Sequence, residues 1–144
     1  MKLNKIFTFI VLFVASIATS SCTQNGGDIG IWFGTWIVKS VSIDGVVQPQ
    51  STSTYFSVQF QGQIVRVTQV DELHEPYNCI YGNWNEDANQ MQWLFPDERQ
   101  PVVPLPGMTR ANKFTITQKN SEAVVLQQVS DSGVTYVYLL EKLV

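Results

Sequence analysis

The sequence predicts an all-β protein, an eight-stranded antiparallel up-and-down barrel, and three observations lead to this prediction. Residues of high β-propensity (Val, Ile, Thr, Tyr, Phe and Trp) dominate from residue 31 onward, and turn signals interrupt them at intervals of about 8 to 12 residues. The connections are mostly short, which favours antiparallel neighbours. Closing eight such strands into a barrel removes the exposed edges that invite aggregation. A two-sheet sandwich is the alternative architecture.

Recognisable turns separate the predicted strands. Asp44-Gly45 is a strong turn pair and ends the first strand. The second strand alternates clearly, because Phe56, Val58 and Phe60 would share one face while polar residues fill the other. The eight predicted strands are 36–43, 55–61, 63–70, 77–84, 90–95, 113–118, 123–130 and 134–142.

The longest connection runs from Phe95 to Arg110 and holds four of the six prolines. Proline cannot donate to a central sheet ladder, so this segment is predicted to be a stiff surface loop. Two interpretations remain open: a flap at the mouth of the barrel, or a rigid crossover that covers one barrel end. The flap would present an apolar lining of Val102, Val103, Leu105 and Met108.

The first 21 residues have the pattern of a signal peptide. Lys2 and Lys5 make the first five residues a basic n-region. The apolar run 6–17 that follows is too short to span a bilayer stably. Small residues then lead into Cys22, and three glycines occur between residues 23 and 30. The sequence therefore predicts a signal peptide (1–21), a flexible tether that begins with Cys22 (22–31) and a barrel domain (32–144).

The run Ala18-Thr19-Ser20-Ser21-Cys22 resembles the lipobox of bacterial lipoproteins. The resemblance implies cleavage before Cys22 and a diacylglycerol on its thiol, with fatty acids such as palmitate as the acyl chains. It also implies a cell-envelope location, at the outer membrane, on either the periplasmic or the surface face. Thr19 departs from the pattern, since a leucine-like residue is more usual there. The alternative is an ordinary signal peptidase, with Cys22 left free or in a disulfide.

The charge balance argues against one class of partner. Nine basic and twelve acidic residues give a net charge of −3, and removing Lys2 and Lys5 with the signal peptide would make it −5. Nucleic acid is not expected as a partner, because no basic excess is available to neutralise phosphates. An acidic protein is weakly repelled by anionic surfaces, so acyl chains rather than charge would hold it at a membrane.

A short motif opens the predicted barrel domain. Gly34-Thr35-Trp36 resembles the Gly-x-Trp signature of the first lipocalin strand, and the segments 34–45 and 136–142 are similar to those of lipocalin-like lipoproteins of the Bacteroidetes. The resemblance implies a calycin-like barrel closed at one end by Trp36 and a small apolar or amphipathic ligand. Lipocalins cover this tryptophan with an arginine from the last strand, and here only Lys142 is available.

Aromatic side chains recur along the predicted strands and supply the candidate ligand site. The interior of an eight-stranded barrel is either filled by side chains or holds one small ligand, and both remain open. Arg66 would face either a ligand carboxylate or solvent. Gln92 and Gln128 are further polar candidates. The predicted ligand-binding residues are Trp36, Phe56, Phe60, Arg66, Tyr81, Trp93, Tyr136 and Tyr138.

No catalytic residue, metal site or cofactor is predicted. His74 is the only histidine and lies in the charged turn 71–76, whereas zinc would require more imidazole or thiolate ligands. One histidine in a loop does not support a Ser-His-Asp or Cys-His set. Carboxylates fall at turns, where water disfavours the raised pKa that acid–base catalysis needs. Cys79 lies in a strand-like setting and is predicted to be a buried, inert thiol.

Two functional hypotheses follow. In the first, a lipid-anchored envelope protein binds a small apolar or amphipathic molecule inside its barrel. In the second, the barrel is filled and the protein is a non-catalytic module that docks an envelope protein partner. Internal volume separates them, because a ligand site usually measures about 300 Å³ or more. A solid core with a large exposed aromatic patch would favour docking.

Overall fold

The computed structural model describes residues 30–144, so the predicted signal peptide, Cys22 and most of the predicted tether lie outside the described part. None of the helical segments in residues 30–144 is long and apolar enough to cross a bilayer. The elements are the 3₁₀ turn η2 (Gly30–Trp32) and the strands β1 (Gly34–Ile43), β2 (Val46–Val47), β3 (Thr54–Gln61), β4 (Ile64–Asp71), β5 (Pro76–Asp87), β6 (Gln90–Leu94), β7 (Ala111–Lys119), β8 (Ala123–Val129) and β9 (Thr135–Lys142).

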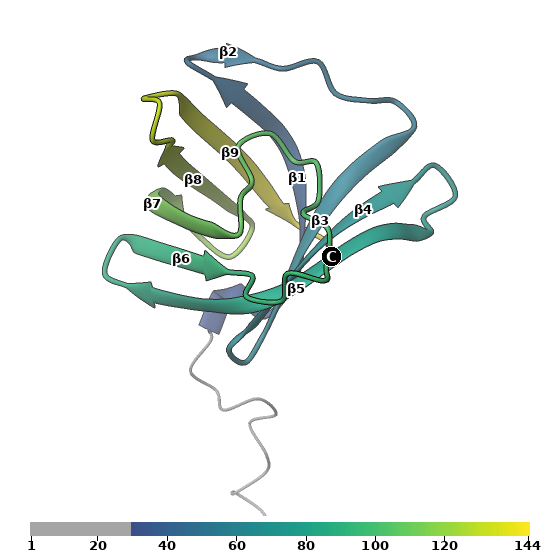
Figure 1. The fold of residues 1–144 in the computed structure, drawn as a ribbon, viewed down its shortest axis with the longest axis horizontal. Coiled ribbons are helices and arrows are strands. Elements are labelled where there is room, and N and C mark those ends of the chain that lie inside the picture. Colours follow the sequence, from purple (N-terminus) through teal and green to yellow (C-terminus); the bar gives the residue numbers. More distant parts are fainter. Residues whose placement is uncertain (1–29) are drawn as a thin grey trace, which may run out of the picture.

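The strands close into a barrel. They are hydrogen-bonded in the order β2-β1-β3-β4-β5-β6-β7-β8-β9, and β1 also pairs with β9. Every strand pairing is antiparallel. The two-residue strand β2 only extends the turn after β1, so eight strands form the wall (Figure 1). The predicted eight-stranded up-and-down barrel is confirmed, and the sandwich is excluded.

The strand boundaries differ from the predicted ones where pairing extends a strand beyond its apolar residues. β5 continues to Asp87, three residues past its predicted end, because its second half pairs with β6. β7 begins at Ala111, two residues earlier than predicted, since Ala111 pairs with Leu94. The short strand β2 was not predicted. Its pairing of Val46 with Ile43 and of Val47 with Ser42 prolongs the Asp44-Gly45 hairpin.

The two ends of the barrel are built differently. The chain reaches the barrel through η2, which lies at the opposite end from β2 (Figure 1). We call the η2 end the closed end and the β2 end the open end. At the closed end, tight turns join β3 to β4, β5 to β6 and β7 to β8. The longer connections, 44–53 and 95–110, both lie at the open end.

Alternating side chains fill the barrel from one end to the other. In β7, for example, Asn112, Phe114 and Ile116 are buried while the residues between them are exposed. Burying apolar surface is worth about 25 cal/mol per Å², so this continuous core is the main source of stability. The largest fully buried side chains are Trp32, Trp36, Phe60, Phe95 and Phe114.

Candidate functional site

Indole rings seal the closed end. Trp36 is fully buried, and its Nε1 donates to the carbonyl oxygen of Trp32 at 3.0 Å. Lys142 extends from the last strand so that its Nζ lies 5.2 Å from the centre of the Trp36 ring. The same ammonium donates to the carbonyl oxygen of Ile31 at 2.8 Å. A lysine therefore lies over the tryptophan, where the lipocalin resemblance implies an arginine.

The carboxylate of Glu86 joins η2 to the barrel wall at the same end. The Nε1 of Trp32 donates to a carboxylate oxygen of Glu86 at 2.6 Å, and Glu86 forms an ion pair with Lys119. The Lys119 ammonium also lies 5.4 Å from the centre of the Trp32 ring. Phe60 and Trp84 pack edge-to-face behind these rings, at 4.9 Å between ring centres. Among the described residues, these contacts close this end of the barrel, so the open end is the side where a ligand site is sought.

The middle of the barrel is filled. Val38, Val58 and Leu140 of the wall surround a narrow apolar gap that has no room for a water molecule. The loop 95–110 fills the remaining space, because Val103 and Leu105 are buried in the barrel core and Val102 and Met108 pack against it. The other residues that line the gap are Trp93, Leu105, Met108, Phe114 and Tyr138.

We call residues 102–108 the plug, since they are the part of the loop that occupies the barrel. The hydroxyl of Tyr138 donates to the carbonyl oxygen of Pro106 at 2.7 Å. The side-chain amide of Gln128 donates to the carbonyl oxygen of Gly107 and to the Tyr138 hydroxyl oxygen, each at 2.7 Å. Burial raises the pKa of the Tyr138 phenol above its ordinary value, so this group remains a neutral donor. We call Tyr138 and Gln128 the latch.

The start of the loop is held by one guanidinium. Arg110 donates to the carbonyl oxygens of Asp97, Glu98 and Gln100, at 2.9, 3.1 and 2.7 Å. In turn, the side-chain oxygen of Gln100 accepts the backbone N–H of Tyr81 at 2.8 Å, at a point where β5 has already parted from β6. Gln100 thus ties the loop to the part of β5 that does not pair with β6.

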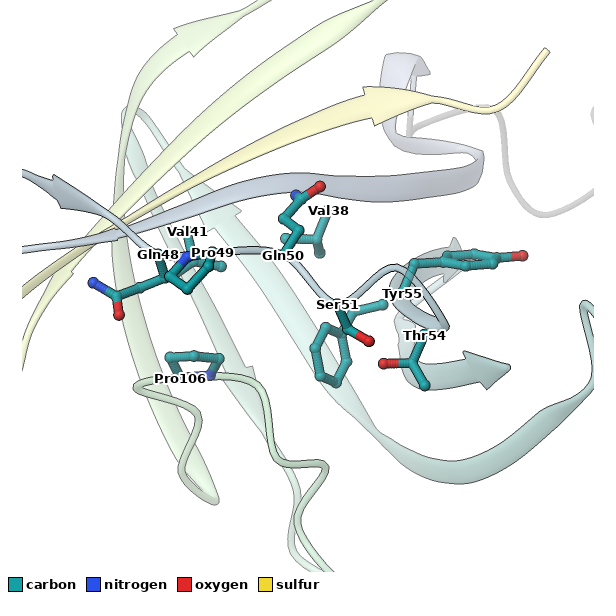
Figure 2. Close-up of a pocket in the computed structure, with 10 residues that line it drawn as sticks. Val38, Val41, Gln48, Pro49, Gln50, Ser51, Thr54, Tyr55 and Pro106 are labelled. Atoms are coloured by element: carbon teal, nitrogen blue, oxygen red, sulfur yellow. The ribbon is translucent and has the colours of Figure 1, made fainter. Parts of the chain in front are cut away.

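A pocket of about 140 Å³ opens beside the plug at the open end. Val38, Val41 and Phe56 form its apolar side. Pro106 of the plug lies across the pocket from the segment 48–50 (Figure 2). Apart from Pro49, uncharged polar side chains form the rest of its rim, and none of its ten lining residues is charged. The remaining lining residues are Gln48, Pro49, Gln50, Ser51, Thr54 and Tyr55.

A shallower polar hollow of about 220 Å³ adjoins this pocket through Ser51, Thr54 and Tyr55. His74 lies on its edge, exposed, with Nδ1 3.3 Å from the Tyr55 hydroxyl. The backbone of His74 has φ +64°, as required by the tight turn between β4 and β5. Within residues 30–144, no three His, Cys, Asp or Glu side chains gather in a way that could hold a metal ion.

The predicted ligand-binding residues divide among several places. Phe56 lines the pocket at the open end, and Trp93 and Tyr138 line the filled middle of the barrel. Trp36 and Phe60 belong to the aromatic cluster of the closed end. Tyr136 is half-buried against Gly107, and Gln128, one of the polar candidates, points inward.

Arg66 and Tyr81 lie on the outside of the barrel and do not face its interior, which corrects their assignment to a site inside the barrel. Val65 and Val67 on either side of Arg66 are fully buried, so alternation turns Arg66 outward. Its cross-strand partner is Tyr81, whose ring centre lies 6.0 Å from the guanidinium carbon and which is 49% exposed. Gln92 is likewise exposed.

Cys79 also differs from its prediction. It is half-buried rather than buried, because it is on the outward face of β5, next to Ile80, which points inward. Its Sγ lies 3.5 Å from the hydroxyl of Thr68 on the neighbouring strand. Among the described residues it has no disulfide partner.

Sequence reasoning missed two apolar residues of the pocket, Val38 and Val41. Strict alternation places residues 38 and 41 on opposite faces of a strand. A register shift in the pairing of β1 with β9, between Val38 and Ser40, lets both valines point inward. The polar residues 48–50 were also missed, because they belong to a loop without a motif.

Comparisons with known proteins bear on the fold. No family model and no curated protein matches the sequence. Among solved structures, the chain is similar to a lipocalin-like protein from Bacteroides uniformis (14% identity, TM-score 0.58, 79% of this chain and 100% of that chain). An uncharacterized protein from Bacteroides eggerthii is similar too (16%, 0.56, 78% and 99%). Lobster apocrustacyanin A1 is a weaker match (8%, 0.45, 79% and 62%). The protein therefore has a lipocalin-like fold, as the Gly-x-Trp motif predicts.

Proposed function

We propose that the protein is a lipid-anchored cell-envelope protein that binds a small apolar or amphipathic molecule at the open end of its barrel. One observation carries the binding proposal. Val38 lines both the open pocket and the apolar gap in the middle of the barrel, so the two spaces adjoin each other. A ligand held in the pocket would therefore lie against the apolar core of the barrel.

The chemistry of the pocket defines the ligand class. With Val41 and Phe56 on one side and amide and hydroxyl groups on its rim, the pocket fits an apolar group that carries an uncharged polar end. Its volume of about 140 Å³ is below that of an ordinary ligand site, so the pocket accommodates one end of such a molecule. Burial would supply about 25 cal/mol per Å² before ordering costs.

The anchoring proposal rests on Cys22 and its neighbours, with the outer membrane as the expected location. Two acyl chains suffice for stable anchoring, whereas one chain binds only marginally. The measurement is the intact mass of the protein extracted from host membranes, together with incorporation of labelled palmitate. We expect acylation of the wild type and none of a Cys22→Ala variant. Labelling that persists in Cys22→Ala would contradict the assignment.

A second function, docking of an envelope protein partner, is favoured by the filled barrel and by one surface. Tyr81 and Leu94 are about half exposed on the outer wall of β5 and β6, and Ile64 is exposed on β4. Their cross-strand positions make them neighbours on one face, because Ile64 and Leu94 both pair with Asn83. A partner on this face would leave the open pocket free.

Native mass spectrometry of the full chain from its own host separates the two functions. We expect a co-purified small molecule in the wild type and its loss in Val41→Phe, which fills the pocket. The matched control is Tyr81→Ser on the outer wall, which should retain the molecule. The wild type could instead carry no small molecule and bind a protein partner that only Tyr81→Ser loses. This result would contradict ligand binding and support docking.

A further inference from the structure

We infer that the plug is a removable, built-in occupant of the ligand chamber and that the latch controls its release. This inference rests on the proposed function, because it describes how the ligand would gain access to the barrel. The plug fills the space that a ligand would need. Three apolar side chains, Val103, Leu105 and Met108, supply the inner part of this filling.

The plug lies in the barrel without being part of its wall. Within residues 102–108, the backbone hydrogen bonds are local. The N–H of Leu105 donates to the carbonyl oxygen of Val103 at 2.8 Å, and the N–H of Met108 donates to the carbonyl oxygen of Leu105 at 3.0 Å. No residue of the plug belongs to a strand ladder. Opening the plug therefore breaks no strand ladder. It does expose the buried Val103 and Leu105, and a bound apolar ligand would offset this cost by its own burial.

Two side chains of the wall make the hydrogen bonds that do hold the plug. Tyr138 and Gln128 lie on neighbouring strands and bind the carbonyl oxygens of Pro106 and Gly107. Gly107 has φ +79°, and a Cβ at this position would overlap the Tyr138 hydroxyl and the Tyr136 ring. Only glycine at position 107 therefore lets the plug lie this close to Tyr136 and Tyr138.

The apolar gap in the middle of the barrel also contains one hydrogen-bond donor without an acceptor. Trp93 lines the filled gap and is 2% exposed, yet its Nε1 has no hydrogen-bond partner among the described residues. A buried donor without an acceptor costs free energy, which an arriving ligand can recover. The plug side chains and this donor together define the occupant: an uncharged apolar molecule with a carbonyl, ether or hydroxyl oxygen.

Hydrogen exchange followed by NMR tests the plug directly. We expect the amides of Leu105 and Met108 to exchange through a local opening, faster than the amides of Val58 and Val67 in the wall. Tyr138→Phe removes the hydroxyl from the latch and should speed the plug amides about fivefold, the value of one hydrogen bond, while the plug amides still exchange faster than the wall amides. Tyr77→Phe removes an exposed hydroxyl and is the control that should change neither.

The neutral fluorophore N-phenyl-1-naphthylamine serves as the apolar probe. If the plug must leave before binding, a looser latch raises the competent fraction, so Tyr138→Phe should bind the probe about fivefold more tightly than the wild type. Bound probe should also accelerate exchange at Leu105 and Met108, because it holds the plug out of the barrel.

The outcomes separate this inference from the proposed function. Probe binding that leaves the plug amides protected, with equal affinity in Tyr138→Phe, overturns the plug while ligand binding stands. Plug amides that exchange only with the wall amides also overturn it. A plug that opens and responds to Tyr138→Phe, with neither the probe nor any host molecule bound, supports the removable plug and contradicts the ligand proposal.

Discussion

Lys142 shows how one side chain can replace another at a sealed barrel end. Its ammonium lies over Trp36 and donates to the carbonyl oxygen of Ile31. We expect Lys142→Met to lower the free energy of unfolding by about 1–2 kcal/mol, since it removes a cation–π contact and a charge-assisted hydrogen bond. Urea unfolding followed by tryptophan fluorescence measures this loss.

The control for Lys142 is Lys39→Met, because Lys39 is half exposed and forms a surface ion pair with Glu141 at 3.6 Å. Surface pairs of this kind contribute little, so the control should stay within about 0.5 kcal/mol of the wild type. Lys142→Arg should retain most of the stability, since arginine offers the same charge over the ring. Equal losses in both lysine-to-methionine variants would remove the special role of Lys142.

Gly82 marks a close approach of two strands. A Cβ at this position would overlap the carbonyl oxygen of Leu94 and the ring of Phe95. We therefore expect Gly82→Ala to destabilise the protein by about 1–3 kcal/mol, because backbone cannot move aside as a side chain can. The midpoint of thermal unfolding checks this, with Gly133→Ala as the control. Gly133 has open space around it, so only the strain of φ +83° of about 1 kcal/mol applies there.

The pKa of Tyr138 makes the latch sensitive to alkali. Burial raises this pKa in the folded protein above the ordinary 10.0, so the folded state holds the proton more tightly than the unfolded state. The stability contributed by the neutral phenol is complete below pH 10 and is lost as the pH rises further. We expect the free energy of unfolding of the wild type to fall more between pH 8 and pH 11 than that of Tyr138→Phe. Parallel curves in denaturant titrations would contradict this.

At the residue scale, the sequence predicted which side chains face the interior well for some strands and poorly for others. Phe56, Val58 and Phe60 share the inward side of β3, because β3 pairs with both of its neighbours without a register shift. Arg66 and Tyr81 were assigned to the site on chemical type, although their strand positions turn them outward. Residue type alone does not fix the face of a strand, which depends on register.

At the scale of elements, the loop 95–110 was visible in the sequence through its prolines, whereas its burial was not. Proline composition predicts that such a segment leaves the ladder. That Val103 and Leu105 return into the barrel depends on tertiary contacts with Tyr138 and Gln128, which lie more than 20 residues away. Long-range packing of this kind has no local signal.

Arg110 determines the shape of the same loop at its base. Its planar guanidinium reaches the carbonyl oxygens of Asp97, Glu98 and Gln100 at once, a geometry that a lysine ammonium does not reproduce. We expect Arg110→Lys to lose about 1–2 kcal/mol and to increase cleavage of the loop by a protease at low temperature. Lys113→Met, an exposed change on β7 just after Arg110, should leave both unchanged. Unaltered cleavage in Arg110→Lys would show that the plug alone orders the loop.

At the scale of the whole molecule, barrel closure explains why the fold could be predicted and the function only in outline. Pairing of β1 with β9 follows from eight strands with short turns, and it buries the apolar faces that the alternation marks. Whether the interior then holds a ligand depends on one loop. The sequence therefore specifies the barrel through many residues and its free volume through very few.

In the proposed lipid-anchored protein, the position of η2 would give the barrel a direction with respect to the membrane. Seven residues separate Cys22 from Gly30, and a chain of this length spans at most about 25 Å. Since Gly30 belongs to the closed end, acylation of Cys22 would keep that end near the bilayer and the open pocket away from it. A ligand would then arrive from the aqueous side.

Energy transfer to a labelled lipid measures this orientation. In a Cys79→Ser background, a donor dye is placed by Ser121→Cys at the closed end or by Ser132→Cys at the open end, both in exposed turns. On vesicles that carry an acceptor lipid, the acylated protein should transfer more efficiently from residue 121 than from residue 132. The strands of the barrel wall, up to 12 residues long, separate the two ends by about 25 Å after tilting, which is enough to resolve the two labels. Equal transfer from both labels would mean that the barrel lies on its side, and the reverse order would place the open end against the membrane.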